Sequence, residues 1–450
     1  MTKEAGSREL VLGILTEVTQ QEEYSHIVIR NVLEKYQYLK KQERAFITRV
    51  AQGTLERLIF LDYIIDRFSS VKVTKMKPVI RSILRMSVYQ LVFMDGVPDA
   101  AVCNEAVKLA RKKGFHNLAG FVNGVLRSIA RSLPDLPCPP EEDGKAFLSV
   151  RYSMPEWIVE KWLNAYGRER TEQILKAFLE KRPLSVRVNL QKITPGALKE
   201  RLEARGIRVR ETPYLSYALE LSGYDYLGAI PEFGEGLFQV QDVSSMLAVE
   251  AAAPEEGAVC MDVCAAPGGK SLHLAEKLRG TGRVEARDLT EYKASLIREN
   301  ADRLGAGNIR VSVWDARVLR EDSVEAADVV LADLPCSGLG VAGRKPDLKY
   351  RVTEKQQEEL AALQREILKV VQSYVKPGGI LVYSTCTINP GENEENVKWF
   401  LGEFPFEAVS LNDCLSRELH GETTKAGYLQ LLPGIHASDG FFIAKFRKKS

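Results

Sequence analysis

The chain of 450 residues is 45% hydrophobic and 27% charged, which is ordinary for a folded globular protein, and its length exceeds what one hydrophobic core usually supports. Its formal net charge is only +2, but residues 1–135 carry 21 Lys and Arg against 14 Asp and Glu, which indicates a nucleic-acid contact unless solvated helix faces account for it. No segment resembles a signal peptide or approaches the roughly 20 apolar residues of a membrane helix, so we expect a cytoplasmic protein.

Residues 7–131 show the periodicity of amphipathic helices and little strand signal. A broad apolar stripe at helical spacing, for example, runs from Val79 to Leu91. We therefore predict an all-α domain of five or more helices over residues 1–135. The proline-rich segment that follows cannot continue a helix or pair in a sheet, so it predicts a linker over residues 136–146.

The middle of the chain predicts a small α/β segment over residues 147–235. This segment starts with a helical pattern over residues 147–180. The stretches SVRVNL and IRVRET then flank a further helical stretch, so we expect a strand–helix–strand unit over residues 185–212.

From residue 236 to residue 450 the apolar pattern alternates between short strands and longer helices. Such alternation predicts an open, mostly parallel, Rossmann-like sheet covered by helices on both faces, in which ligands bind at the carboxyl ends of strands. The predicted strands are 259–263, 283–288, 309–314, 329–333 and 380–384. The predicted fold class is therefore multi-domain, with an all-α N-terminal domain, a small α/β segment and an α/β Rossmann-like domain.

The first of these strands ends in the segment Asp262-Val-Cys-Ala-Ala-Pro-Gly-Gly-Lys270-Ser. Its small residues let the backbone approach a ligand closely, and the free amides of the following helix would suit a nucleotide-like cofactor. A phosphate-binding P-loop would need a glycine where Cys264 stands, so a kinase or an ATPase is disfavoured. A tight strand-to-helix turn without a ligand is the alternative interpretation.

Aspartates follow the next two strands. Asp288 ends the second strand, where doubly wound folds place an acid that accepts hydrogen bonds from a ribose diol. Asp315 follows the third strand and would lie beside an adenine. Either residue alone could be a helix cap or a surface charge. Three strand ends in register nevertheless favour a cofactor site.

Two cysteines each follow an apolar strand, Cys336 in the segment Asp333-Leu-Pro-Cys-Ser-Gly and Cys386 in Ser-Thr-Cys-Thr. A buried structural thiol is the usual fate of a cysteine, but two thiols at adjacent ligand-facing strand ends favour a chemical role. The chain has seven cysteines and five histidines, which do not combine into the ligand pattern of a tetrahedral site. We therefore expect free thiols and no metal.

The segments DVCAAPGGK, DLPCSG and STCT, in this order and spacing, resemble the signatures of the RNA 5-methylcytosine methyltransferases. The sequence departs from this family in the second strand, VEARDL, where Glu285 and Arg287 replace more apolar residues. The N-terminal part resembles a NusB-like RNA-binding domain. Further matching segments are 98–107 and 121–127 for the NusB-like domain, and 238–242, 344–347, 390–393 and 439–442 for the methyltransferase.

The resemblance implies an enzyme that transfers a methyl group from S-adenosylmethionine to C5 of a cytosine in 16S ribosomal RNA. It implies that Cys386 is the nucleophile and that Cys336 assists product release, as a base or by positioning one. Cytosine C5 is too poor a nucleophile until a thiolate adds at C6, so the chemistry agrees. Lys270 would help electrostatically, and Asp333 would meet N3 and the exocyclic amine of the cytosine. The residues implied in cofactor binding are Cys264, Ala265, Ala266, Pro267, Gly268, Gly269, Lys270, Asp288, Asp315 and Asp333.

Other functions stay open at this point. Transfer RNA is the alternative substrate, and a non-catalytic RNA-binding factor with a degenerate methyltransferase domain is the alternative class. The tripeptide Glu395-Asn-Val resembles one in DNA cytosine methyltransferases, whose nucleophile belongs to the Pro-Cys motif, here Cys336. An adenine-N6 methyltransferase would need Asn-Pro-Pro-Tyr where this chain has Asp333-Leu-Pro-Cys. We expect a monomer, because no exposed apolar heptad indicates a dimer.

Overall fold

The structure is a computed structural model of the chain that describes residues 6–21 and 23–450. Residues 1–5 and 22 of the predicted helical domain lie outside the described residues. By their contacts the residues form two compact units, one that runs to Glu180 and also contains Ala342–Arg351, and one of Lys181–Val341 and Val352–Ser450. None of the described helices is long and apolar enough to cross a lipid bilayer.

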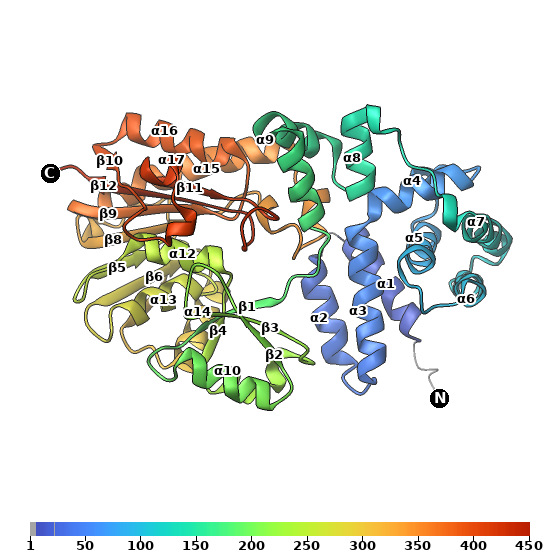
Figure 1. Ribbon diagram of the computed structural model, residues 1–450, viewed down its shortest axis with the longest axis horizontal. Helices are drawn as coiled ribbons and strands as arrows, with labels where there is room; N and C mark the ends of the chain where they lie inside the picture. Colours follow the sequence, from blue (N-terminus) through green and yellow to red (C-terminus); the bar gives the residue numbers. More distant parts are fainter. Residues whose placement is uncertain (1–5, 22) are drawn as a thin grey trace. The chain divides into compact units, whose positions relative to one another are not determined.

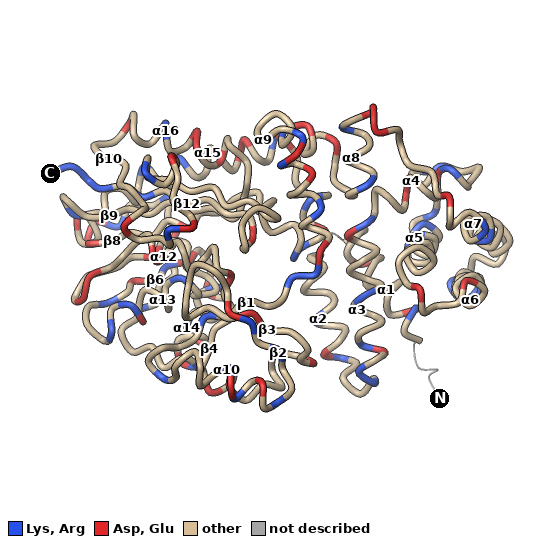
Figure 2. The backbone as a smooth tube through the Cα atoms, in the orientation of Figure 1, with Lys and Arg blue, Asp and Glu red and all other residues tan. Residues whose placement is uncertain are grey.

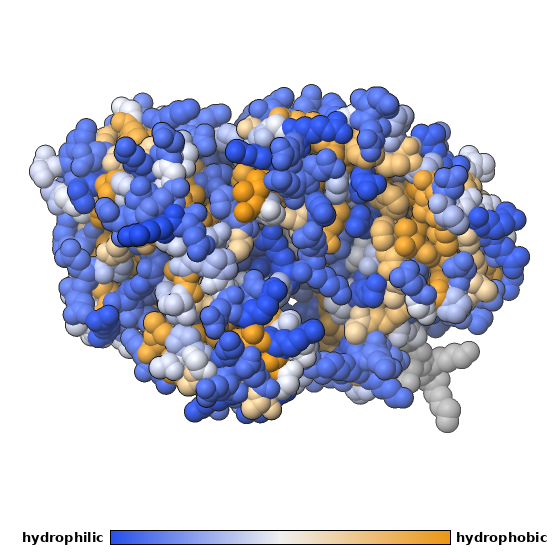
Figure 3. Space-filling model, in the orientation of Figure 1, coloured by the Kyte–Doolittle hydropathy of each residue, from blue (hydrophilic) through white to orange (hydrophobic). Residues whose placement is uncertain are grey.

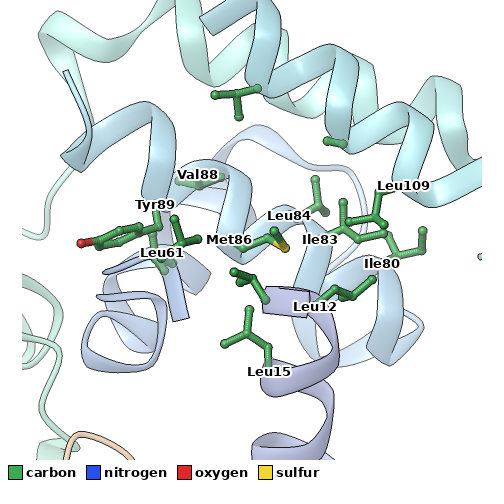
Figure 4. Close-up of a cluster of buried hydrophobic side chains, with 14 of the residues drawn as sticks. Leu12, Leu15, Leu61, Ile80, Ile83, Leu84, Met86, Val88, Tyr89 and Leu109 are labelled. Atoms are coloured by element: carbon green, nitrogen blue, oxygen red, sulfur yellow. The ribbon is translucent and has the colours of Figure 1, made fainter. Parts of the chain in front are cut away.

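The first unit is helical, as predicted for its N-terminal part, and α5 (Pro78–Phe93) runs through its core (Figure 1). Pro78 stands in the first turn, where its missing amide would have no partner anyway. Helices α1, α3, α4, α6 and α7 all contact α5, and Figure 4 shows apolar side chains of α1, α4 and α6 gathered around it. The bounds of the other helices are α1 (Ser7–Gln20), α2 (Ser25–Lys35), α3 (Lys41–Glu56), α4 (Leu58–Phe68), α6 (Asp99–Lys112) and α7 (Ala119–Arg131).

A glycine on α3 makes room for an aromatic side chain of α5. A Cβ atom at Gly53 would lie only 2.0 Å from the tip of the Tyr89 ring, so a larger residue would displace this side chain. The face of the molecule in Figure 3 is largely hydrophilic, with some apolar side chains in the region of α5. The helices are therefore amphipathic, with their apolar sides turned inward, as their periodicity predicted.

Two further helices, α8 (Gly144–Tyr152) and α9 (Glu156–Ala177), belong to the same unit. Ser153, which separates them, accepts hydrogen bonds from the amides of Ile59 at 2.9 Å and Phe60 at 3.3 Å in the first turn of α4. These amides have no partner within their own helix, so the Ser153 hydroxyl caps α4 from a distant part of the chain. The predicted boundaries after residues 135 and 146 stay predictions, but the contacts group residues 147–180 with the helices.

The segment Ala342–Arg351 comes from within the predicted domain 236–450, yet its contacts place it in the helical unit. Asp347 accepts hydrogen bonds from the amide of Ser25, at 3.2 Å, and from its hydroxyl, at the start of α2. A carboxylate there satisfies free amides and faces the positive end of the helix dipole. Lys349 donates to the carbonyl of Glu56 at 2.9 Å, at the end of α3. These contacts with two helix ends anchor the segment.

The buried ammonium group of Lys349 should make the stability of this unit depend on pH. Burial lowers the pKa of Lys349 from 10.5 to about 7, an effect that Glu56 opposes and Arg57 reinforces. Between these two pH values the unfolded chain holds a proton that the folded chain lacks, so the free energy of unfolding rises with pH. We expect a gain of about 2 kcal/mol from pH 7 to pH 9, which Lys349→Met should remove.

Urea unfolding of the full chain at both pH values, followed by hydrogen exchange in α2 and α3, measures this difference. A matched control is Lys108→Met, because Lys108 is exposed and pairs with Glu105 on its own helix. An equal dependence on pH in the unmodified chain and in Lys349→Met would contradict the prediction.

The second unit contains a small antiparallel sheet with the strand order β2-β3-β1-β4. The predicted strand–helix–strand unit is confirmed as β1, α10 and β2, whereas β3 and β4 were not predicted. Strand β4 pairs with β1, with Val240 opposite Val186. The predicted end of the small α/β segment at residue 235 would therefore assign β4 to the next domain, although β4 belongs to the small sheet. The elements are β1 (Leu184–Val188), α10 (Pro195–Ala204), β2 (Arg208–Glu211), β3 (Ala218–Ser222) and β4 (Phe238–Val240).

The larger sheet has the order β10-β12-β9-β8-β5-β6-β7, and β11 pairs with β12 (Figure 1). Strands β5 to β9 are parallel and β12 is antiparallel to β9, so the mostly parallel sheet is confirmed. The strands are β5 (Val259–Asp262), β6 (Arg283–Asp288), β7 (Ile309–Val313), β8 (Ala327–Asp333), β9 (Val375–Thr385), β10 (Phe406–Ala408), β11 (Tyr428–Leu431) and β12 (Phe441–Lys448).

Helices cover both faces of this sheet, as predicted. In Figure 1, α15 and α16 lie on one face, and α12, α13 and α14 lie on the other. Their bounds are α12 (Val243–Ala252), α13 (Gly269–Lys277), α14 (Glu291–Leu304), α15 (Glu354–Val371) and α16 (Glu394–Glu403). Parallel strands with helical crossovers bring the carboxyl ends of β5 to β9 to the same edge of the sheet.

The charged residues in β6 do not interrupt the strand. Arg287 is buried, and its guanidinium donates to the hydroxyl of Ser323 at 2.7 Å and lies over the ring of Tyr374 at 5.5 Å. Glu285 pairs with Arg283 at 3.3 Å. Strand β6 is therefore an interior strand between β5 and β7, even though it carries more charge than interior strands usually do.

Candidate active site

The loop after β5, predicted to bind a cofactor, is a tight turn held by its own backbone. The amide of Ala265 donates to the carbonyl of Arg287 at 2.9 Å, and the amide of Gly268 donates to the carbonyl of Ala265 at 2.7 Å. Gly268 has a φ of +101°, and a Cβ atom there would lie 3.2 Å from the side chain of Ile297 on α14. Helix α13 begins at the next residue, so its first amides, which lack partners within the helix, lie at this turn.

The two aspartates expected to bind a nucleoside lie at the ends of β6 and β7. Asp288 is buried; one of its carboxylate oxygens accepts the amide of Ala266 at 2.9 Å, and the other pairs with Lys293 at 2.9 Å. The carboxylate of Asp315 accepts hydrogen bonds from the backbone amide of Arg317 at 2.9 Å and from its guanidinium group at 2.7 Å. These hydrogen bonds lower the pKa of Asp315. Asp288 thus braces the turn, whereas Asp315 lies nearer the surface.

Lys270, Asp333 and Ser384 form a hydrogen-bonded chain at the ends of three neighbouring strands. Lys270 donates to one oxygen of Asp333 at 2.7 Å, and the Ser384 hydroxyl donates to the other at 2.8 Å. Burial by itself would lower the pKa of Lys270, but the charges of Asp333, Asp262 and Cys386, with the hydrogen bond to Asp333, raise it above 10.5. Lys270 is therefore an ammonium ion at neutral pH.

The two thiols singled out from the sequence are in contact. The Sγ atoms of Cys336 and Cys386 are 3.3 Å apart. The amide of Gly340 donates to the carbonyl of Cys386 at 3.0 Å, and the amide of Gly440 donates to the carbonyl of Gly340 at 2.9 Å. A Cβ atom at Gly340 would lie 2.0 Å from the carbonyl oxygen of Gly440. These two glycines therefore allow three segments of the chain to close around the thiols.

The two thiols differ in the charges that surround them. The pKa of Cys336 is raised well above 9.0 by its hydrogen bond to Cys386, then by burial, and then by the negative charges of Cys386 and Glu392. Cys386 instead interacts with the ammonium group of Lys270. A neighbouring cation favours a thiolate and a neighbouring anion disfavours it. The site therefore favours a thiolate on Cys386 over one on Cys336.

A carboxyl group beneath the turn lacks part of its hydrogen bonding. One oxygen of Asp262 accepts the hydroxyl of Ser271 at 2.6 Å, while Oδ1 is buried without a hydrogen-bond partner among the described residues. Burial raises the pKa of Asp262 to about 7. Burial also raises the pKa of Cys264, which makes it an unreactive thiol under the turn. Asp262 and the first amides of α13 together suit a ligand that carries both a cationic and an anionic group.

The described residues do not contain a group of three or more His, Cys, Asp or Glu side chains that could hold a metal ion. All seven cysteines are free thiols in the structure.

Comparison with known proteins decides the family. The model of the 16S rRNA methyltransferase RsmB/F family matches residues 249–447, that of the NusB family matches residues 5–131, and that of a ferredoxin-like domain of RsmF/B-like methyltransferases matches residues 154–224. The probable ribosomal RNA small subunit methyltransferase B of Bacillus subtilis (strain 168) is 39% identical over 99% of this chain and 100% of its own length. The chain belongs to the ribosomal RNA small subunit methyltransferase B family.

Other relatives agree with this membership. The methyltransferase B of Cronobacter sakazakii is 31% identical, with 100% of both chains covered. The crystal structure of PH0851 matches with a TM-score of 0.83 and 27% identity over 100% of this chain and 99% of its own. The crystal structure of NSun6 from Pyrococcus horikoshii with SFG matches with a TM-score of 0.59 and 25% identity over 66% of this chain and 98% of its own. The methyltransferase resemblance and the NusB-like domain inferred from the motifs are therefore confirmed.

In this member of the methyltransferase B family, the structure brings all four expected catalytic residues into one cluster. Lys270 lies in the first turn of α13, which follows β5, and Asp333, Cys336 and Cys386 come from the carboxyl ends of β8 and β9 and the loops that follow them. Asp288 contacts the cofactor turn rather than this cluster. The expected residues thus divide into a cofactor part and a thiol part along one edge of the sheet.

Sequence reasoning missed two residues of the thiol part. Ser384 donates to Asp333, and it was visible only as the first letter of STCT. Glu392 lies beside Cys336, in the segment 390–393 that resembles the methyltransferase family but for which no role was predicted. An acidic residue in a Pro-Gly turn just after a ligand-facing strand was the available signal.

Proposed function

We propose that the chain transfers a methyl group from S-adenosylmethionine to C5 of a cytosine in 16S ribosomal RNA, with Cys386 as the nucleophile. One observation carries this proposal: two thiols lie 3.3 Å apart, with a Lys270–Asp333 ion pair beside them. Methylation of a nucleobase nitrogen or of a ribose hydroxyl needs no covalent catalyst. Methylation of a pyrimidine carbon does need a covalent catalyst, so a pair of thiols favours C5 of cytosine as the methylated atom.

The Cys386 thiolate would add to C6 of the cytosine, which forms a carbon–sulfur bond and makes C5 electron-rich. S-adenosylmethionine, when bound, supplies the methyl group that C5 accepts. Loss of the C5 proton then restores the C5–C6 double bond and expels Cys386 as a thiolate. Cys336 lies 3.3 Å from the sulfur that departs, so it is placed to take this proton when it is ionised, or to position, as a thiol, the base that takes it.

Two charged residues would stabilise the cytosine while the thiolate is attached. The carboxylate of Asp333 would accept hydrogen bonds from N3–H and from the exocyclic amine, which holds the proton that neutralises the ring. Lys270 pairs with Asp333 at 2.7 Å, and its ammonium group favours the thiolate of Cys386.

The turn after β5 would hold the cofactor. The first amides of α13 suit the carboxylate of its amino-acid end, the carboxyl group of Asp262 suits its amino group, and Asp288 and Asp315 are the candidates for the nucleoside. NSun6, with which this fold aligns, was crystallised with SFG, an analogue of S-adenosylmethionine. This likeness supports the cofactor assignment.

The helical unit would supply affinity for RNA. It matches the NusB family, and residues 1–135 have a positive net charge. Figure 2 shows Lys and Arg on several of its helices. Such side chains bind phosphates, while the target base must leave its stack to reach the thiols.

Methyl transfer by this chain tests the proposal. With S-adenosylmethionine carrying a labelled methyl group, we expect 5-methylcytidine in 16S ribosomal RNA, found by mass spectrometry of digested RNA and located by bisulfite sequencing. Bulk transfer RNA is tested in parallel. If only transfer RNA were methylated, transfer RNA and not ribosomal RNA would be the substrate. A methylated nitrogen would overturn the proposed chemistry. Absence of S-adenosylmethionine binding in calorimetry would favour a non-catalytic factor.

A further inference from the structure

Two consecutive residues after β9, Glu392 and Asn393, are completely buried beside the thiols, and the mechanism above gives neither of them a part. The carboxylate of Glu392 accepts hydrogen bonds from the amide of Ser337 at 2.7 Å and from its hydroxyl at 2.5 Å. Ser337 directly follows Cys336. Glu392 therefore binds the backbone of the loop that carries Cys336, through both of its oxygens.

The other donors to Glu392 are neutral amides. Asn389 donates to one oxygen at 3.1 Å and Gln364 to the other at 3.2 Å. Gln364 also donates to the carbonyl of Pro335, the residue before Cys336, at 2.9 Å. A buried carboxylate is costly unless it is well hydrogen-bonded, and these donors meet that need without neutralising its charge. The negative charge thus stays close to Cys336.

Asn393 holds the other thiol in a comparable way. Its amide oxygen accepts the hydroxyl of Thr385 at 2.5 Å, and its amide nitrogen donates to the carbonyl of Thr387 at 3.0 Å. These two threonines stand on either side of Cys386. Asn393 also donates to Gln430 at 2.8 Å, which ties this turn to β11.

A direct hydrogen bond joins the two loops. The hydroxyls of Ser337 and Thr387, the residues that follow the two cysteines, are 2.8 Å apart. Each loop is therefore held by its own residue of the Glu392–Asn393 pair, and the loops are linked to each other through Ser337 and Thr387.

We propose that Glu392 and Asn393 are positioning residues with separate tasks, Glu392 fixing Cys336 for release of the product and Asn393 fixing Cys386 for attack on the cytosine. This inference rests on the proposed function, because it assigns one residue to each thiol of that mechanism. Covalent catalysis needs both thiols in place at different steps, and a displacement of about 1 Å is enough to slow a step severely.

The charge of Glu392 gives its role a measurable signature. The titratable groups that face Cys336 are Cys386, Glu392 and Tyr383, with Arg365 close to the last. Glu392 contributes to the raised pKa of Cys336, so its removal should move the pH dependence of product release to lower pH. A residue that only stabilised the fold would not move this profile.

The experiment follows formation and release of the RNA–protein adduct separately in the full chain. Formation is measured as a denaturant-stable complex with RNA containing 5-fluorocytosine, which cannot lose a C5 proton. Release is measured as decay of the adduct formed on ordinary RNA. We expect Glu392→Gln to lower the maximal rate of release about tenfold and to leave formation nearly unchanged, and Asn393→Ala to slow formation about tenfold. Ser337→Ala should slow release less than Glu392→Gln does.

Two buried residues outside the site serve as matched controls. Glu232 pairs with Arg205, and Asn189 donates to backbone carbonyls of Gly236 and Leu304. Glu232→Gln and Asn189→Ala should leave the ratio between the rates of adduct formation and adduct release unchanged. Thermal unfolding of every variant shows whether a loss reflects folding, and Ser337→Ala keeps the inference testable if Glu392→Gln does not fold.

The inference is overturned if Glu392→Gln releases product at the normal rate with an unchanged pH profile, or if both variants slow formation and release in the same ratio. Failure of the proposed function looks different. In that case the unmodified chain forms no adduct with 5-fluorocytosine RNA, or Cys386→Ala still forms one, whatever the two positioning variants do.

Discussion

Cys386→Ala should abolish methyl transfer to RNA and covalent capture of RNA together. Without the thiolate, cytosine C5 is not activated, so we expect the methylation rate to fall by roughly four orders of magnitude or more, the scale seen when a covalent nucleophile is removed. Binding of S-adenosylmethionine should persist, because the turn after β5 holds itself through backbone hydrogen bonds of Ala265 and Gly268. Labelled methyl transfer, denaturing gels and calorimetry measure the three quantities.

Cys336→Ala should behave in the opposite way. The proposed nucleophile, Cys386, is intact in this variant, so the adduct should form. The residue proposed to assist release is missing, so the adduct should accumulate in a form stable to denaturant. Cys138→Ala is the control, because Cys138 is an exposed thiol of the helical unit. If Cys336→Ala blocked capture and Cys386→Ala accumulated the adduct, the nucleophile would be Cys336, as the Pro-Cys motif of DNA cytosine methyltransferases suggests.

The position of the site could be predicted from the sequence because parallel strands impose it. Once β5, β8 and β9 were identified, their following residues had to meet at one edge of the sheet, which brings together Lys270, Asp333 and the two cysteines. The contact between the thiols could not be predicted. It depends on Gly340 and Gly440, whose backbones approach each other only in the folded chain.

The contacts of individual site residues could not be predicted from the sequence either. Asp288 was expected to bind a ribose, and the structure shows it bracing the turn through Ala266 and pairing with Lys293. The partners of Glu392 include Ser337 and Gln364, which lie well before it in the chain, so the local pattern could mark this residue but could not predict its contacts.

The fold shows the same division between local and long-range information. The strands β5 to β9 were predicted from the alternation of short strands with helices, even though β6 carries charged residues. The antiparallel strand β12 (Phe441–Lys448), which pairs with β9, was not predicted. Membership of Ala342–Arg351 in the helical unit depends on bonds from Asp347 and Lys349 to helix ends far away in the sequence.

Lys270→Met should slow formation of the adduct about a hundredfold at pH 7. This loss corresponds to a shift of about two pH units in the ionisation of the Cys386 thiol that limits adduct formation. The ammonium group of Lys270 is a cation that interacts with Cys386, and its ion pair with Asp333 has an N–O distance of 2.7 Å. Without it, Asp333 is left as an uncompensated anion near the thiol. Both changes disfavour the thiolate, so the rate should recover as the pH is raised toward 9.

Lys277→Met is the matched control, because Lys277 lies on the same helix and pairs with Glu250 away from the thiols. Calorimetry with S-adenosylmethionine separates a weaker cofactor site from a slower attack, since formation of the adduct with 5-fluorocytosine RNA can be followed at saturating cofactor. Asp333→Asn in the Lys270→Met background should restore stability by removing the unpaired charge, but it should not restore the rate, because the asparagine cannot hold a protonated cytosine as a carboxylate does. A pH profile in Lys270→Met that matches the unmodified chain would mean that another group activates Cys386.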